Sequence, residues 1–351
     1  MDKISKTNKI HPNMIKNVYE NNFREEIEKI CFLIEDFPYI GMDTEFPGIV
    51  YSKDEFKQLS NYNLIKKNVD DLRVIQVGIT LADQFGNFPE NICTWQFNLR
   101  FDSENDLSNK ESMQLLISSG INFSKHNSNG ISHLEFGEML YTSGLILNPE
   151  VYWVTFHGIY DFAYLLKVIK NVKLPDKESE FYDDLITYFG TYYDLRYLIQ
   201  FTDYSKGSLQ KLASECNVQR IGTQHQAGSD SLVTLMAFFK ISKEICCTTP
   251  ISNYKNKLFH YNEKDDVDYE SNNKFMNMQQ MKYYGGNMSN MNNNMMFIYN
   301  HPMYNNNLNM NGINNLNGIN NMSTMSSNLN MNNIPSYMMM NYNLNNDGKD
   351  V

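Results

Sequence analysis

Two carboxylates set two residues apart, Asp43 and Glu45, carry the clearest chemistry in this chain of 351 residues. They end an apolar run from Phe37 to Met42, a pattern typical of a buried strand. Because side chains alternate along a strand, both acids would project from one face, with Thr44 as a spacer between them. Neighbouring carboxylates repel, and such pairs usually persist because a cation or a proton lies between them. Exposed acid pairs are common at strand ends, so a metal site requires further ligands.

Two later acids, Asp161 and Asp230, lie at the starts of predicted helices. An acid in a first helical turn complements the helix dipole, with Ser229 as the predicted cap before Asp230, so each acid has a purely structural interpretation. Acids just past strand ends are also where open α/β sheets place their chemistry. His225 precedes Asp230 on a loop that contains glycine, and beside acid ligands it becomes a candidate general base.

Four acids and one histidine therefore form a candidate site from dispersed segments. Their combined charge suits two divalent cations, and carboxylate oxygens favour Mg²⁺ or Mn²⁺ over zinc or copper. Two such ions suit in-line displacement at a phosphodiester, where one activates water and the other stabilises the leaving oxygen. The predicted catalytic residues are Asp43, Glu45, Asp161, His225 and Asp230, and the four acids are the predicted metal ligands.

The elements that would position these residues alternate between strands and helices. After a helix over residues 22–35 and the strand that ends in acid, strands over 73–81 and 91–101 are predicted to form an antiparallel hairpin. A helical insert and further alternation predict an α/β fold, with a mixed sheet flanked by helices. The remaining predicted strands cover 151–156 and 191–195, and the remaining helices cover 112–118, 134–143, 161–170, 209–216 and 230–241.

Composition divides the chain into three parts. Residues 1–20 are predicted to be an N-terminal extension, residues 21–265 the catalytic domain, and residues 266–351 a disordered tail rich in Asn and Met. The net charge of −10 argues against broad electrostatic binding of nucleic acid. The five cysteines form no recognisable pairs, and no apolar stretch of about 20 residues exists, so we expect reduced thiols and no membrane span.

The order of these residues resembles that of the DEDD exonucleases in their histidine-bearing branch. More closely, the chain resembles the CAF/POP-type deadenylases, the catalytic subunits of the CCR–NOT complex. The resemblance implies a ribonuclease-H-like fold, 3′-to-5′ removal of poly(A) from messenger RNA with release of AMP, and two Mg²⁺ or Mn²⁺ ions. It also implies that Phe46 lies against a terminal base. The matching stretches are Met42 to Gly48, Thr94 to Asn98, Tyr160 to Phe162, and Arg220 to Gly222 continuing through His225 to Leu232.

The same resemblance implies partners: poly(A) RNA, the NOT scaffold subunit, and a second deadenylase of the complex. Tyr141, Leu147 and Pro149 fall in the expected scaffold-facing region, although ordinary packing at a helix end explains them equally well. The chain departs from the family at Gly158 and Ile159, where the family has Ser-Gly. The bulkier Ile159 would alter packing near the site and bears on substrate contacts more than on metal binding.

Two other functions remain open from the sequence. A non-catalytic adaptor on this fold would bridge RNA-decay factors, but such a protein is expected to have lost an acid ligand, and all five positions are present. An enzyme acting on DNA or on other RNA 3′ ends would keep the same residues. The acidic charge favours a tethered enzyme whose partners supply RNA affinity. The reduced thiols predict a location in the cytoplasm and nucleus.

Overall fold

The structure is a computed structural model that describes residues 11–259 apart from residues 205, 246 and 248. The tail predicted over residues 266–351, with its expected disorder, lies outside the described residues. Within the described part of the chain, no helix is both long enough and apolar enough to cross a membrane.

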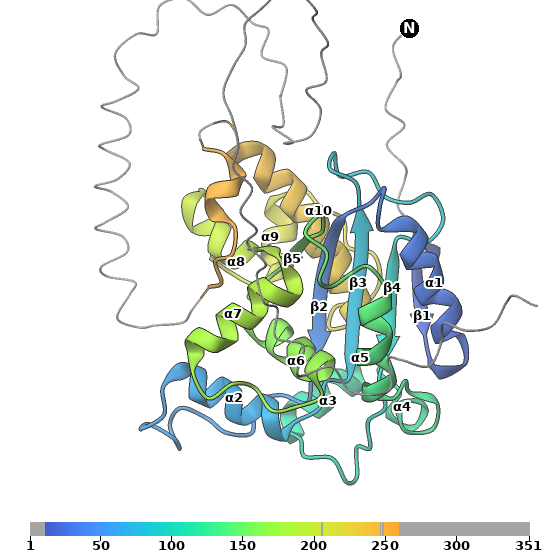
Figure 1. Cartoon of the computed structure of the whole chain (residues 1–351), viewed down its shortest axis with the longest axis vertical. Coiled ribbons are helices and arrows are strands. Elements are labelled where there is room, and N and C mark those ends of the chain that lie inside the picture. The colour runs from blue at the N-terminus through green and yellow to red at the C-terminus, as the bar shows by residue number, and fades with distance from the viewer. Residues whose placement is uncertain (1–10, 205, 246, 248, 260–351) are drawn as a thin grey trace, which may run out of the picture. The chain divides into compact units, whose positions relative to one another are not determined.

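A mixed sheet of six strands forms the centre of the fold (Figure 1). The strand order is β1-β4-β3-β2-β5-β6, so the predicted hairpin lies beside the strand that carries the acid pair. The two central pairings, β2 with β3 and β3 with β4, are antiparallel, and the other three pairings are parallel. The strands are β1 (Ile15–Val18), β2 (Tyr39–Glu45), β3 (Gln76–Ala82), β4 (Thr94–Asn98), β5 (Tyr152–Thr155) and β6 (Thr191–Asp194).

Helices cover both faces of this sheet, which makes a three-layer α/β arrangement. Three of them, α2, α4 and α7, fall in segments with no predicted element, and α8 begins at Leu195, the last residue of a predicted strand. The α-helices are α1 (Phe23–Leu33), α2 (Asn61–Asp71), α3 (Lys110–Ser118), α4 (Phe123–Asn129), α5 (His133–Thr142), α6 (Ile159–Lys170), α7 (Glu178–Phe189), α8 (Leu195–Leu198), α9 (Leu209–Glu215) and α10 (Ala227–Ile245). Short 3₁₀ turns cover Pro12–Met14, Glu20–Asn22, Ile199–Phe201 and Ile251–Tyr254.

The two faces of β2 pack against different helices. Ile40 and Met42 are fully buried in a core cluster that includes side chains of α5 and α6. On the other face, Gly41 lets the backbone of α10 come so close that an added Cβ would lie 2.5 Å from the Ser231 carbonyl oxygen. The alternation of β2 side chains therefore divides its residues between α6 and α10.

The N-terminal domain boundary needs correction. Residues 15–18 belong to the predicted extension, but they form β1, which pairs in parallel with β4 and completes one edge of the sheet. Val18 is fully buried there. A four-residue edge strand shows almost no periodicity of its own, so the sequence pattern could not reveal it.

Candidate active site

The predicted acid pair occupies the carboxyl end of β2, where the sheet meets the first turns of two helices. Asp43 lies opposite Gly78 on β3, and Glu45 lies opposite Gln76. Both acids therefore share the face of the sheet that packs against α10, as the two-residue spacing predicts. The residue between them, Thr44, points toward the opposite face and toward α6.

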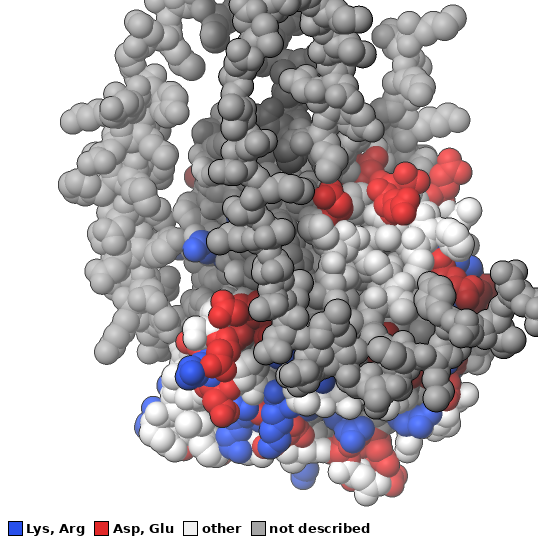
Figure 2. Space-filling model, in the orientation of Figure 1, with Lys and Arg blue, Asp and Glu red and all other residues white. Residues whose placement is uncertain are grey.

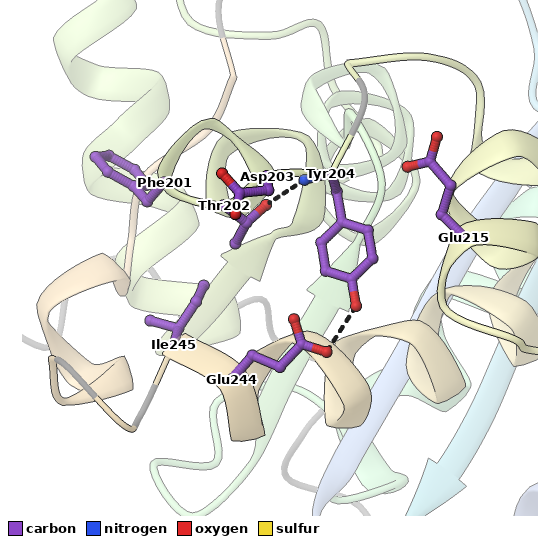
Figure 3. A pocket seen from close by; sticks show the side chains of 7 residues that line it. All are labelled: Phe201, Thr202, Asp203, Tyr204, Glu215, Glu244 and Ile245. Carbon is purple, nitrogen blue, oxygen red and sulfur yellow. Dashed lines mark hydrogen bonds between the residues drawn. The ribbon is translucent and has the colours of Figure 1, made fainter.

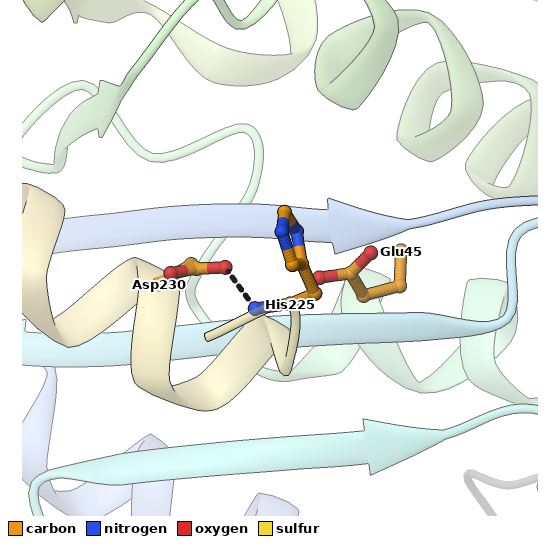
Figure 4. Close-up of side chains that lie close together, drawn as sticks. All are labelled: Glu45, His225 and Asp230. Atoms are coloured by element: carbon orange, nitrogen blue, oxygen red, sulfur yellow. Dashed lines mark hydrogen bonds between the residues drawn. The ribbon is translucent and has the colours of Figure 1, made fainter. Parts of the chain in front are cut away.

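Glu45, His225 and Asp230 come together at the start of α10 (Figure 4). Each offers one ligand atom, and these three atoms all lie within 4.8 Å of one another. The backbone N–H of His225 donates to Oδ2 of Asp230 at 3.0 Å, which closes the loop onto the helix. The structure thus unites a strand end and a loop 180 residues later in the chain around one point.

Asp161 joins the site through Thr44. It lies in the first turn of α6 and is only 6 % exposed, and its Oδ1 accepts a hydrogen bond of 2.5 Å from the Thr44 hydroxyl. The interpretation of Thr44 as a mere spacer is therefore wrong, because its side chain fixes an acid on the other helix. This contact joins residues 117 positions apart, which no local pattern could predict.

Arg220 is a further member of the site, and the sequence alone predicts no role for it. Its Nη1 donates to Oδ1 of Asp230 and, at 3.0 Å, to Oγ of Ser229, while its Nε donates to Gln210 at 2.6 Å. Ser229 is not the helix cap that the sequence predicted, because α10 begins two residues earlier, at Ala227. The Ser229 hydroxyl instead donates to the Ile221 carbonyl at 2.7 Å. Arg220 thus supplies a positive charge, on a side chain that is 11% exposed, beside the acids.

The carboxylates perturb one another strongly. Desolvation raises the pKa of Asp43 well above its usual value, and the charges of Asp230, Asp161 and Glu45 raise it further. Desolvation, followed by the charges of Asp230 and Asp161, raises the pKa of Glu45 in the same way. Desolvation also raises the pKa of Asp161 to about 7, against the lowering effect of the Thr44 hydrogen bond. The nearby Arg220 lowers the pKa of Asp43 and Glu45 without offsetting the repulsion.

Buried amide side chains hold the loop that carries His225. Oε1 of Gln226 accepts hydrogen bonds from Nε2 of Gln96 at 2.8 Å and of Gln76 at 3.2 Å. Its own Nε2 donates to the Ser119 carbonyl at 2.9 Å. Because Gln226 directly follows His225, these bonds fix the histidine, whose φ of 60° lies in the left-handed region. The loop that carries the histidine is thus anchored at the residue that follows it.

An aromatic cluster extends the site beyond Glu45. The half-buried ring of Phe46 stacks on Tyr160 with centroids 5.3 Å apart, and it contacts Tyr164 at 4.9 Å. The neighbouring Ile159, which departs from the family pattern, is buried in the main core cluster. It therefore packs away from solvent. The role of Phe46 against a terminal base stays a prediction.

The donor set fits divalent cations. The four carboxylates lie near a single guanidinium, that of Arg220, so the protein alone does not balance their negative charge. Carboxylate oxygen is the ligand that Mg²⁺ and Mn²⁺ prefer. Carboxylates that lie close together also require a counter-ion or protons between them. The residues that would hold the ions are Asp43, Glu45, Asp161 and Asp230, with His225 at the rim.

Replacing Thr44 with Val tests the contact to Asp161. The substitution keeps the shape but removes the hydroxyl donor, so we expect Mn²⁺ affinity to fall about tenfold, as for other groups that orient metal ligands. Isothermal titration calorimetry measures the change. Thr44→Ser keeps the donor and serves as the matched control; equal affinity in wild type and Thr44→Val would show that the bond has no orienting role.

The raised carboxylate pKa values predict a pH dependence of the metal-free protein. Groups with a raised folded pKa stabilise the fold at low pH, and this contribution is lost as pH rises through about 7. Burial lowers the pKa of His126 and His133, which has the opposite effect, but only below about pH 6.5.

With EDTA present, we therefore expect the melting temperature to fall by at least about 3 °C between pH 6.5 and 8.5. Saturating Mn²⁺ should remove this fall, because the cations replace the protons. Differential scanning calorimetry checks both arms, and a flat or rising profile in EDTA would contradict the assignment.

A separate cavity of about 480 Å³ lies between α9, α10 and the turn Ile199–Phe201 (Figure 3). Its lining includes the carboxylates of Asp203, Glu215 and Glu244, and the Tyr204 hydroxyl donates to Glu244 at 2.7 Å. None of the predicted site residues lines this cavity. It is therefore distinct from the acid cluster at the end of β2.

Comparisons with known proteins show the family of this chain. The family profile described as "CAF1 family ribonuclease" matches residues 18–139. The chain is 40% identical over 272 residues to "Poly(A) ribonuclease pop2" of Schizosaccharomyces pombe, covering 76% of this chain and 80% of that protein.

Two solved structures share the fold. The structure of S. pombe Pop2p in its Mg²⁺- and Mn²⁺-bound form matches with a TM-score of 0.65 and 42% identity, covering 70% of this chain and 98% of that one. The structure of the yeast NOT1 MIF4G domain co-crystallised with CAF1 matches with a TM-score of 0.62 and 30% identity, covering 72% of this chain and 99% of that one. The predicted ribonuclease-H-like mixed sheet is confirmed. The chain belongs to the CAF1 family of ribonucleases.

Proposed function

We propose that this protein is a metal-dependent 3′-to-5′ exoribonuclease that shortens the poly(A) tails of messenger RNA and releases AMP. The observation that carries the proposal is the meeting of four carboxylates from β2, α6 and α10 at one end of the sheet. The 40% identity to a poly(A) ribonuclease over most of both chains supports the substrate class.

The chain's own residues divide the work of hydrolysis. Asp43, Glu45, Asp161 and Asp230 would hold two Mg²⁺ or Mn²⁺ ions, a choice that the bound form of the S. pombe relative supports. When bound, such ions lower the pKa of water and stabilise charge on the leaving 3′ oxygen. The His225 imidazole lies beside Glu45 and Asp230 and would take the proton from the attacking water at a ring nitrogen.

Phe46, at the rim of the site, is the residue proposed to position the substrate. The Phe46 ring follows Glu45 directly and is half-buried, so part of it remains accessible to a base of a single strand. Aromatic stacking of this kind holds single-stranded nucleic acid with little dependence on the base. We therefore assign Phe46 to holding the terminal nucleotide, while the choice of adenine rests on the relatives.

Partners would supply RNA affinity that this acidic chain does not provide by itself. On the face drawn in Figure 2, the described Lys and Arg side chains are interspersed with Asp and Glu, and the net charge is −10. We therefore propose that the protein acts while tethered to the NOT scaffold and a second deadenylase of the CCR–NOT complex, since a solved relative binds NOT1. We place the complex in the cytoplasm and nucleus, which suits the free thiols of Cys31, Cys93, Cys216 and Cys247.

A tail-shortening assay tests the activity. Full-length protein with Mn²⁺ should remove a 3′ run of 20 adenosines from a 5′-labelled RNA and release AMP, while EDTA should stop the reaction. The same RNA body with uridine or cytidine tails, and the matching DNA, should remain largely intact. Shortening that continues in EDTA would refute a metal-dependent enzyme, and equal rates on all tails would refute the substrate assignment.

Leu147 offers a test of the scaffold contact. Its side chain is 51% exposed and its φ of 54° is one that Asp tolerates, so Leu147→Asp should leave the fold intact. We expect binding to a MIF4G-type scaffold domain to weaken at least about tenfold, since a buried charge without a partner is costly at an interface. Ile186→Asp, at an exposed position of α7, is the matched control, and unchanged binding of Leu147→Asp would place the contact elsewhere.

A further inference from the structure

A fully buried carboxylate, that of Asp194, gathers four backbone N–H groups at the end of β6. Its Oδ1 accepts from His157 and Arg196, both at 2.8 Å, and its Oδ2 accepts from Gly158 at 3.3 Å and Phe259 at 2.9 Å. These donors come from three separate segments of the chain. Hydrogen bonds to an ionised acceptor are about twice as strong as neutral ones, so Asp194 fixes all three segments relative to β6.

The first of these segments leads directly to a predicted metal ligand. Gly158 is the residue before α6, and Asp161 lies in the first turn of that helix. His157 has a φ of 62°, a conformation disfavoured for a residue with a side chain. Gly158 lies so close to Thr155 that an added Cβ would be 2.0 Å from its Oγ1. This tight turn sets where α6 begins, and the bonds to Asp194 hold it in that form.

The second segment comes from the end of the described chain and lies along the open edge of β6. The Asn256 backbone N–H donates to the Tyr192 carbonyl at 2.8 Å, and the Asn256 side-chain oxygen accepts from the Tyr192 N–H at 3.0 Å. Leu258 is buried in the main core cluster. The Phe259 ring contacts the His157 ring, with centroids 5.3 Å apart, and also lies 5.2 Å from the Arg196 guanidinium.

We propose that Asp194 and residues 256–259 together position the metal site. Residues 256–259 are named here the C-terminal clasp. The clasp donates to Asp194, Asp194 holds the turn before α6, and that turn places Asp161 against Thr44. Metal affinity therefore depends on a segment that begins 26 residues after the last predicted ligand, Asp230, although the clasp itself touches no ligand. The inference rests on the proposed metal site.

Mn²⁺ titration of full-length variants tests the proposal. Asp194→Asn replaces one acceptor oxygen with a donor, and Phe259→Pro removes the clasp N–H, whereas Phe259→Leu keeps it. We expect the first two substitutions to weaken Mn²⁺ binding at least about tenfold, the range seen when groups that orient ligands are changed. Phe259→Leu should stay within about threefold of wild type.

A general loss of stability is separated from positioning by a core variant away from this region. Ile30 is fully buried in α1. Ile30→Ala should lower the melting temperature at least as much as Asp194→Asn and Phe259→Pro do, while leaving Mn²⁺ affinity within twofold of wild type. If Asp194→Asn does not fold, the Mn²⁺ affinity of Phe259→Pro alone tests the proposal.

Unchanged Mn²⁺ affinity in Phe259→Pro would overturn the clasp, and equal weakening in Ile30→Ala would overturn positioning in favour of a merely structural role. Failure of the wild-type protein to bind Mn²⁺ would refute the metal site itself, which is a different result.

Discussion

Replacing Asp43 with Asn is expected to abolish poly(A) shortening while making the metal-free protein more stable. Asp43 is the acid whose pKa is raised by all three other carboxylates, Asp230, Asp161 and Glu45, so it lies at the electrostatic centre of the site. Loss of this ligand removes several kcal/mol of charge stabilisation, which corresponds to a rate decrease of at least about a thousandfold. The same change removes a repelling charge, so the melting temperature in EDTA at pH 8 should rise.

Activity and the stability of the metal-free protein are expected to change in opposite directions, which separates this result from simple damage to the fold. A substitution that merely damaged the fold would lower activity and stability together. Asp36→Asn is the matched control, because Asp36 is exposed at the end of the helical region before β2, and it should change neither quantity. Retained activity in Asp43→Asn, or a lowered melting temperature in EDTA, would show that Asp43 does not have this central position.

A methyl group added at Gly78 should disrupt both fold and activity. Gly78 lies opposite Asp43, and an added Cβ would be 2.0 Å from the Ala227 carbonyl oxygen and 2.7 Å from the Gly228 nitrogen. Both atoms belong to the backbone at the start of α10, so the helix must move away from the sheet. The cost of such overpacking is about 2–4 kcal/mol, or roughly 5–10 °C in melting temperature for a domain of this size.

Activity should fall further than this stability loss explains. The start of α10 carries Asp230 and follows His225, and a displacement of about 1 Å at a catalytic group lowers the rate roughly a hundredfold. Assays well below the melting temperature separate the two effects. Ser124→Ala, at an exposed position of α4, is the control, and wild-type activity in Gly78→Ala would mean that close packing of α10 does not position the site.

The central part of the fold could be predicted from local patterns. β2, β3 and β4 alternate or carry continuous apolar residues, and the short connection between β3 and β4 predicts their antiparallel pairing. α2 was missed because its segment is largely polar, and its start depends on Ser60, whose side chain accepts from the Asn63 N–H. α7 did carry a signal, since Phe181, Leu185 and Phe189 recur at four-residue spacing and are buried.

The predicted site residues were found because their chemistry is unusual at strand and helix ends. Glu45, His225 and Asp230 lie close together, Asp43 lies on the same face of β2 as Glu45, and Asp161 accepts a hydrogen bond from Thr44. The supporting residues could not be found in this way. Thr44, Arg220 and Asp194 act through contacts that span about 10 to 117 positions, and no spacing rule links such residues before the sheet and helices are assembled.

The central claim is that these acids hold catalytic cations, and anomalous diffraction from Mn²⁺-soaked crystals tests it most directly. The account predicts two manganese peaks about 4 Å apart, both in contact with carboxylate oxygens of the acid cluster. It is contradicted if no peak lies in the cluster of Asp43, Glu45, Asp161 and Asp230, or if manganese binds only in the acidic cavity of Asp203, Glu215 and Glu244.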